Sequence, residues 1–309
     1  MNYRIYNKRY IFIGISALII VVGIMAAYFS GIILDIQFKG GSVITYTYEG
    51  ELNTDDVNSK LSSALELDVS NVQDNYNEAL DMKSISISIS GTKTLSVKEK
   101  SAIDKLFAED EILKELNFKL YEEITVDPSI GKTYLRNGIM ALVIAAVLII
   151  LYVWYRFRSM SGPSAGIMAL MVLSHDLLIV FAAFVLLKIP LNENLIAVLL
   201  TIIGYSINNT IVIYDRIREN MALDTKNTDL GELVDHSIIQ TMSRSINTTV
   251  TTLGTMLITY IFASIYGIAS VQNFALPMII GLLAGFYSSV FLAGPTWVMW
   301  KTRGGRTGF

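Results

Sequence analysis

Six long apolar stretches constrain this chain more than any other feature of its sequence. Each holds about 20 mostly apolar residues, the length that an α-helix needs to cross the hydrocarbon core of a bilayer. Charged residues make up only 17% of the 309 residues, against about 25% in a typical soluble domain. We therefore expect a polytopic α-helical membrane protein with six transmembrane helices, at residues 11–34, 138–155, 163–187, 195–214, 245–264 and 271–300.

The first apolar stretch could also belong to a cleaved signal peptide, because Arg4, Lys8 and Arg9 precede it. Its apolar run is longer than the roughly 7 to 15 residues that are usual in signal peptides. We therefore expect it to be retained as a membrane helix.

Lysine and arginine gather at one set of helix ends, and this pattern predicts the orientation of the chain. The short loops on the opposite side, 188–194 and 265–270, contain only Lys188. We expect both termini in the cytoplasm, an extracytoplasmic domain at 36–134 between the first helix (within 1–35) and the other five (within 135–300), and a cytoplasmic tail at 301–309. The basic residues are Arg4, Lys8 and Arg9; Arg156 and Arg158; Arg216, Arg218, Lys226 and Arg244; and Lys301, Arg303 and Arg306.

Residues 36–134 are polar and carry most of the acidic side chains. Strand patterns at 43–48, 69–76, 84–90 and 118–126 and helical patterns at 55–67 and 96–116 give the order β-α-β-β-α-β, which suits a ferredoxin-like α+β domain. The run 84–90 alternates serine with isoleucine and has a second interpretation as a low-complexity spacer. The helical patterns on either side need a sheet to pack against, which favours the strand.

Composition also disfavours several classes of function. The net charge of -3 and the lack of a basic, aromatic-rich stretch argue against a nucleic-acid partner. The chain contains no cysteine and two histidines, His175 and His236, so disulfides, thiolate sites and a multi-histidine metal centre are not expected. The 36–134 domain has neither a phosphate-binding glycine loop nor a nucleophile–base–acid spacing. We expect a binding domain without a cofactor, and not an enzyme.

Polar groups inside the predicted spans mark the candidate site. His175 and Asp176 lie near the middle of the third span, and Asp176 is the only carboxylate deep in any span. Ionisable groups at such depth face the bundle interior or a water-filled path, and they are usually functional. A purely structural role, in which the carboxylate is hydrogen-bonded to a neighbouring helix, is the alternative.

The fourth and fifth spans hold the other candidates. Asn208 and Asn209 lie in the fourth span, Asp215 follows them, and the fifth span begins near Arg244 and is rich in threonine. Counting from the membrane edges places Asn209 and Arg244 at similar depth, so we expect the asparagines to face the arginine. Many of the threonines are explained equally well by helix packing.

Several segments together point to one known family. They are 35–41 (Asp-Ile-Gln-Phe-Lys-Gly-Gly), 126–131 (Val-Asp-Pro-Ser-Ile-Gly), His175-Asp176, 202–220, Arg244 followed by 248–252, and Ser288-Ser289. In these segments the chain resembles SecF of the SecD/SecF family, accessory subunits of the bacterial Sec translocon within the resistance-nodulation-division superfamily. The likeness covers nearly the whole chain, and 202–220 is its most specific part.

The resemblance implies partners and a task. SecF proteins pair with SecD, a second six-helix chain, and assist late steps of export through the SecYEG channel by using the proton or sodium gradient. Their outer domains hold or release the translocating unfolded polypeptide, and their spans contact membrane lipids. The implied location is the bacterial cytoplasmic membrane.

One position departs from the family pattern. Many relatives have an aspartate implicated in ion coupling where this chain has Asn209, and an amide cannot titrate near neutral pH. Three explanations follow: SecD supplies the titrating carboxylate, Asp176 takes part, or coupling uses a cation that amide oxygens help to bind. We favour the first.

Two other functions stay open at this point. The chain could be half of a resistance-nodulation-division exporter of small molecules or lipids, or a membrane-anchored binding protein that transports nothing. Copurification with SecD or with the channel would separate them. Gly40, Gly41 and Gly131, near the two junctions of the outer domain, are candidates for hinges or for simple turns.

Overall fold

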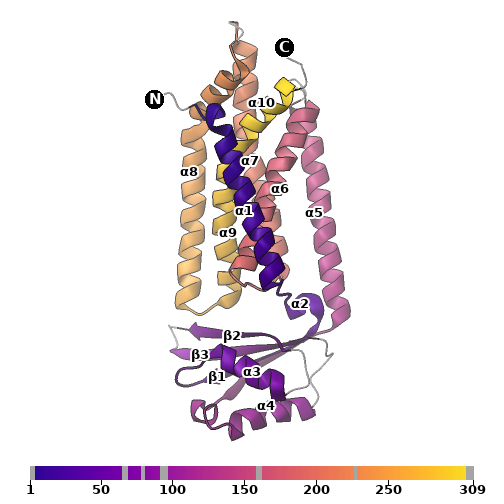
Figure 1. Cartoon of the computed structure of the whole chain (residues 1–309), viewed down its shortest axis with the longest axis vertical. Coiled ribbons are helices and arrows are strands. Elements are labelled where there is room, and N and C mark those ends of the chain that lie inside the picture. Colours follow the sequence, from indigo (N-terminus) through magenta and orange to yellow (C-terminus); the bar gives the residue numbers. More distant parts are fainter. Residues whose placement is uncertain are drawn as a thin grey trace.

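A bundle of long helices stands on a small α+β domain, and both chain ends lie at the far end of the bundle (Figure 1). The computed structural model describes residues 4–64, 69–77, 81–90, 97–157, 162–225 and 228–303. Three of the basic residues used to predict the orientation, Arg158, Lys226 and Arg306, lie outside this range, as does most of the predicted tail at 301–309.

Six helical segments within the described residues are long and apolar enough to cross a membrane, as predicted. The last of them passes through a π-helical turn. The segments are α1 (Arg9–Ser30, after the short η1, Tyr6–Lys8), α5 (Pro128–Arg156), α6 (Gly162–Leu186), α7 (Glu193–Leu223), α8 (Leu230–Ile265), and α9 (Ala269–Ser288) continued by η4 (Ser289–Ala293, the π turn) and α10 (Gly294–Arg303).

Helices α7 and α8 are longer than the predicted spans. Their 31 and 36 residues extend about 46 and 54 Å, well beyond the roughly 30 Å of hydrocarbon. The predicted span at 245–264 is only the second half of α8. The hydropathy pattern does not detect the first half, which begins where the Asp229 side chain accepts a hydrogen bond from the Gly231 N–H and caps the helix.

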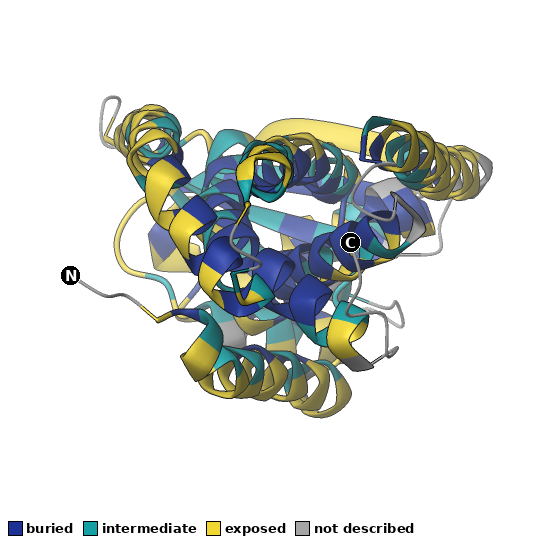
Figure 2. Cartoon of the chain, turned by 90° about the horizontal axis from the view of Figure 1, so that it is seen from above, coloured by how far each residue is buried: buried dark blue, intermediate teal, exposed yellow. Residues whose placement is uncertain are grey.

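Helices α6, α7 and α9 form the inside of the bundle. At least half of the residues in their most apolar windows are buried, against 11% in α1, α5 and α8, and the buried residues lie in the middle of the view along the bundle (Figure 2). Side chains such as Leu18 on α1 and Val143 on α5 are exposed. Such outward apolar faces suit contact with lipid tails.

The α+β domain has the predicted order β-α-β-β-α-β. Its sheet is antiparallel, with the strands in the order β2-β3-β1-β4. The predicted helix end at 67 and helix start at 96 lie outside the described residues, and the second helix ends at Glu109 instead of 116. The elements are β1 (Gly41–Tyr48), α3 (Thr54–Ala64), β2 (Val69–Asn77), β3 (Met82–Ser90), α4 (Val97–Glu109), η2 (Lys114–Leu116) and β4 (Lys119–Val126).

The serine–isoleucine run is strand β3, so its interpretation as a spacer is wrong. Ile85, Ile87 and Ile89 are fully buried and share one core with Leu61 of α3 and Ile103 of α4. The alternation places every isoleucine on the face that the two helices cover.

Two junctions join the domain to the bundle. The short α2 (Ile36–Lys39) leads to Gly40 and Gly41, both with positive φ (77° and 143°), where the chain turns into β1. Gly131 lies in the first turn of α5, so the chain makes no turn there. The loop between α8 and α9 also contacts the domain, because a Cβ on Gly267 would lie 2.7 Å from the Tyr76 carbonyl oxygen.

Candidate polar site within the helix bundle

Asp176 of α6 is fully buried and has hydrogen-bond partners at both carboxylate oxygens. Oδ2 accepts from the Ser206 hydroxyl of α7 at 2.5 Å and from the Ser288 hydroxyl of α9 at 2.8 Å. Oδ1 lies 2.9 Å from Nδ1 of His175. A carboxylate in a bilayer is costly unless it is paired or hydrogen-bonded, and these three partners from three helices offset that cost.

His175 contacts Tyr287, which in turn is hydrogen-bonded to α1. Its ring stacks on Tyr287, with centroids 6.3 Å apart and planes 28° from parallel, and the Tyr287 hydroxyl donates to the Phe12 carbonyl at 2.8 Å. His175 is itself buried, and its Nε2 has no hydrogen-bond partner in the described structure. The imidazole is therefore held in place, but only one of its two ring nitrogens has a hydrogen-bond partner in the described structure.

Further hydroxyl groups continue from Asp176 toward the bundle end that holds the termini. The Ser289 hydroxyl donates to the Ser206 carbonyl at 3.3 Å and lies 3.1 Å from the Thr210 hydroxyl, one helical turn along α7. One more turn along, the Tyr214 hydroxyl donates to the Ala293 carbonyl at 3.3 Å. Ser289 and Ala293 are the two ends of the π turn, a feature that is frequent at functional sites.

The described structure contains no hydrogen bond between either asparagine and Arg244, so their predicted contact stays a prediction. Asn209 is buried and its Nδ2 has no partner, whereas Asn208 and Arg244 are exposed. The hydrogen bond between Tyr205 of α7 and Thr249 of α8 shows that Asn209 and Arg244 do lie at similar depth. Successive α-helical residues are about 100° apart around the axis, so depth alone does not bring two side chains together.

Exposed, mostly polar residues recur at helical spacing along α7 and along α8, and we call them together the α7–α8 polar face. Three of its threonines bond carbonyls of their own helix four residues back, so they do not require an outside partner. Arg244 is also exposed, about 21 Å from the start of α8, and it has no ion pair among the described residues. The face comprises Thr201, Gly204, Asn208, Arg244, Asn247, Thr251 and Thr255.

Asp215 lies apart from the buried site. Its carboxylate pairs with Arg156 at 2.9 Å and with Arg218 at 2.6 Å, and its side chain is 42% exposed. It follows Ser206 by nine residues, about 14 Å along α7. Asp215 therefore belongs to the basic end of the bundle.

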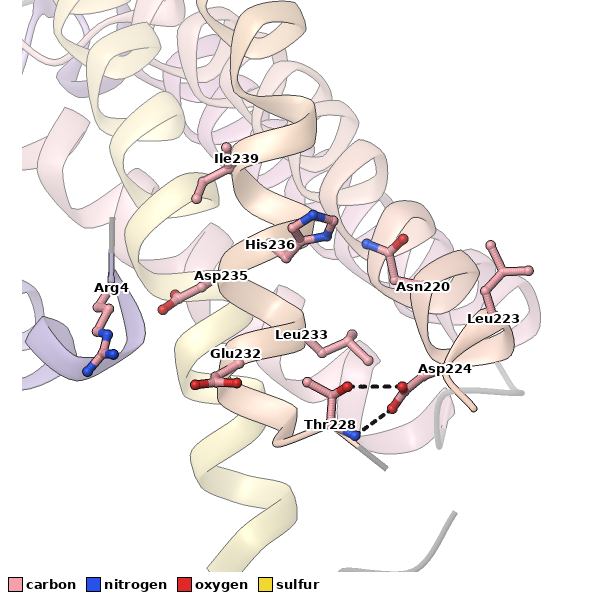
Figure 3. A pocket seen from close by; sticks show the side chains of 10 residues that line it. All are labelled: Arg4, Asn220, Leu223, Asp224, Thr228, Glu232, Leu233, Asp235, His236 and Ile239. Carbon is pink, nitrogen blue, oxygen red and sulfur yellow. Dashed lines mark hydrogen bonds between the residues drawn. The ribbon is translucent and has the colours of Figure 1, made fainter. Parts of the chain in front are cut away.

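A pocket of about 560 Å³ opens at this same end, between Arg4 and the α7–α8 hairpin (Figure 3). The Tyr6 N–H donates to Asp235 at 2.8 Å, which fixes the N-terminal segment beside the pocket. The charges that line it are mixed, and no cluster that could hold a metal is found in the described part of the chain. The lining residues are Arg4, Asn220, Leu223, Asp224, Thr228, Glu232, Leu233, Asp235, His236 and Ile239.

Comparison with known proteins identifies the family. Residues 108–303 match the model described as "Protein export membrane protein SecD/SecF, C-terminal". The chain belongs to the SecD/SecF family. It is 31% identical to the protein translocase subunit SecF of Anaerolinea thermophila, over 97% of this chain and 94% of that protein. It is also 31% identical to the SecF of Acidaminococcus fermentans, over 98% of each.

A SecDF crystal structure shows the same architecture in a longer chain. The SecDF of Thermus thermophilus, described as a translocon-associated membrane protein, superposes with a TM-score of 0.79 at 28% identity over 98% of this chain. The match covers only 39% of the SecDF chain. A 44% identical SecF from Alicyclobacillus acidocaldarius aligns over 58% of this chain and 56% of its own length. Together with the six apolar helices, these likenesses identify a multi-pass membrane protein of this family.

Sequence reasoning missed two parts of the site, Tyr287 and the π turn. The signal for the π turn is Gly294-Pro295 at its end. Proline has no N–H to donate to the carbonyl four residues earlier, which is that of Phe291, inside the turn. Tyr287 gave no signal, because its contact with His175 joins two helices that are far apart in the sequence.

Proposed function

We propose that this chain is the SecF-like half of a protein-export accessory unit in the bacterial cytoplasmic membrane. It pairs there with a SecD-like six-helix chain and uses an ion gradient to assist late steps of export. The observation that carries the proposal is the likeness to SecF proteins over nearly the whole chain. In the SecDF of Thermus thermophilus the corresponding part is 39% of one chain, and a SecD-like chain would correspond to the rest.

The α7–α8 polar face is the proposed contact surface for that partner. Arg244 lies at the edge of the predicted span 245–264, where an arginine needs a carboxylate or water beside it, and the described part of this chain supplies no carboxylate to Arg244. A SecD-like partner that places a titrating carboxylate against Arg244 would complete the pair. Such a carboxylate would also replace the one that many relatives carry at the position of Asn209.

The outer domain and the orientation complete the proposal. Basic residues are concentrated at the bundle end that carries both termini, which supports a cytoplasmic location for that end. The α+β domain would then lie outside, where it holds or releases the translocating polypeptide as it leaves the SecYEG channel. No cofactor and no catalytic step are part of this function.

The test is protein export into membrane vesicles that carry this chain with its SecD-like partner, under an imposed proton or sodium gradient. We expect one of the two gradients to stimulate export. Arg244→Gln should abolish that stimulation, whereas Arg216→Gln, which changes an arginine paired with Glu219 near the end of α7, should retain it. Equal export with and without either gradient, in a correctly assembled pair, would contradict the proposed coupling.

A further inference from the structure

Apart from His175, whose imidazole is cationic only when protonated, no described side chain forms an ion pair with Asp176. The described groups that contact the His175–Asp176 pair are neutral: the Ser206 and Ser288 hydroxyls and the Tyr287 ring. Tyr287 is the only other titratable group among them, and its hydroxyl donates a hydrogen bond to the Phe12 carbonyl of α1. A buried carboxylate of this kind is normally paired with a cation or protonated.

We infer that His175 and Asp176 together form a proton-binding site within this chain. With the carboxylate ionised and the imidazole neutral, the pair carries one negative charge. A proton taken from water, bound at either residue, makes the pair neutral, and its release to water restores the negative charge. Because the two groups are 2.9 Å apart, the titration belongs to the pair and not to either residue alone.

Three buried polar atoms, on α6 and on the neighbouring α1 and α7, are candidates for contact with water. His175 Nε2, Ser16 Oγ and Asn209 Nδ2 are buried and have no partner among the described residues. Ser16 lies one turn along α1 from Phe12, which binds Tyr287 beneath the His175 ring. Buried polar atoms without protein partners are usually satisfied by ordered water.

Hydroxyl groups also lie on the other side of Asp176, toward the basic end of the bundle. Ser206, Ser289, Thr210 and Tyr214 follow one another toward the basic end of the bundle, within 3.3 Å of their hydrogen-bond partners. The π turn supplies the Ala293 carbonyl that the last of them binds. Ser289 and Tyr214 donate to backbone carbonyls, those of Ser206 and Ala293, so the hydroxyls do not form a continuous chain and a proton would need water to pass between them.

This inference rests on the proposed function for its purpose, because an export unit coupled to protons needs groups that bind and release them, and this pair would be one within the chain in addition to the carboxylate proposed for the partner. Proton binding by the His175–Asp176 pair can be measured without an export assay. The chain has only two histidines, so the ring nitrogens of a ¹⁵N-histidine-labelled chain in lipid nanodiscs give two sets of NMR signals. The variant His236→Gln assigns them.

We expect the His175 ring signals of the full chain to change with pH between about pH 4 and 9. In Asp176→Asn the midpoint should move by about one pH unit or more, as expected for coupled groups. Ser288→Ala, which keeps the carboxylate and removes one donor, should also move it. Asp215→Asn, the matched change to a carboxylate at the bundle end, should not. Signals that stay constant across this range, or a midpoint that is the same in Asp176→Asn and Ser288→Ala as in the original chain, would overturn the inference.

Export measurements on the same variants separate the two proposals. If the pair titrates but neither gradient changes export, the proposed coupling is refuted and the proton site is retained. A pair that does not titrate, in a chain whose export responds to the proton gradient, would refute the proton site and leave the proposed function standing.

Discussion

Gly281 determines how closely α9 packs against α6 and α7. A Cβ at this position would lie 2.6 Å from Cδ1 and 2.7 Å from Cγ1 of Ile202, and 2.8 Å from Cγ2 of Val180. Ile202 and Val180 are fully buried. Since carbon atoms in contact are about 3.5 to 4.0 Å apart, Gly281→Ala must push α9 outward or force both side chains from their preferred rotamers.

The expected magnitudes allow a double-mutant cycle. Overpacking lowers the free energy of unfolding by about 1 to 3 kcal/mol, and Ile202→Ala alone should lower it by about 2 to 5 kcal/mol because it leaves a cavity. In the double variant the new methyl group enters the space that Ile202 vacates. The double variant should therefore be about 0.5 to 3 kcal/mol more stable than the sum of the single effects.

Reversible unfolding in mixed micelles, followed by tryptophan fluorescence, measures these free energies. The control is Gly14→Ala on α1, where an added Cβ meets no atom within 4 Å; it should not destabilise the chain. Single effects that add within about 0.3 to 0.5 kcal/mol would refute the reasoning. Gly285 and Ser288 follow Gly281 on the same face of α9, so the cycle also tests what holds Ser288 against Asp176.

Three further predictions concern the outer domain, the buried amide and the orientation. The Lys60 ammonium, 2.6 Å from the Asp110 carboxylate, lowers the pKa of that carboxyl below its ordinary value. The stabilisation by this ion pair is therefore complete above the pKa that the Asp110 carboxyl has in the unfolded state. It is lost as pH falls through the lower pKa of the folded state. In Lys60→Met, amide-exchange protection in α3 and α4 should fall less between about pH 5 and 2 than it does in the original chain. An unchanged dependence on pH would contradict a stabilising role for this ion pair. Asn209→Leu removes a buried donor that has no partner among the described residues. If no water binds it, the change should leave the free energy of unfolding unchanged or raise it by about 1 kcal/mol; a loss above about 2 kcal/mol would show that the amide has a partner, such as water. In this cysteine-free chain, Ser101→Cys should react with a membrane-impermeant thiol reagent from the outside and Thr302→Cys only from the cytoplasmic face. The reverse pattern would overturn the proposed orientation.

The helices and strands could be predicted because their patterns are local. A long apolar run has few alternatives to a membrane helix, and isoleucine at every second position from Ile85 to Ile89 suits a strand covered on one face. The depth of Asp176 followed in the same way from counting residues. The first half of α8 was missed because a helix that leaves the hydrocarbon needs no apolar pattern of this kind.

Contacts between helices could not be predicted, because they depend on how each helix is rotated about its axis. The two hydroxyls that bind Asp176 Oδ2 come from Ser206, 30 residues away, and from Ser288, 112 residues away. Asn208 and Asn209 are neighbours in sequence, yet one is exposed and the other buried. Similar depth therefore suggested a contact between Asn209 and Arg244, but it does not fix the rotation of α7 and α8 on which such a contact depends.

The π turn at Ser289–Ala293 makes the length of this stretch matter more than its composition. A π turn takes one residue more than the α-helical turn it replaces, so the face that α10 presents is advanced by about 100°. Trp297, which is fully buried and donates to Ser164 at 3.3 Å, depends on that advance. Deleting one residue from the turn would rotate Trp297 by about 100° about the helix axis, away from its buried position. Aligned relatives should therefore vary in residue type here but show no insertions or deletions.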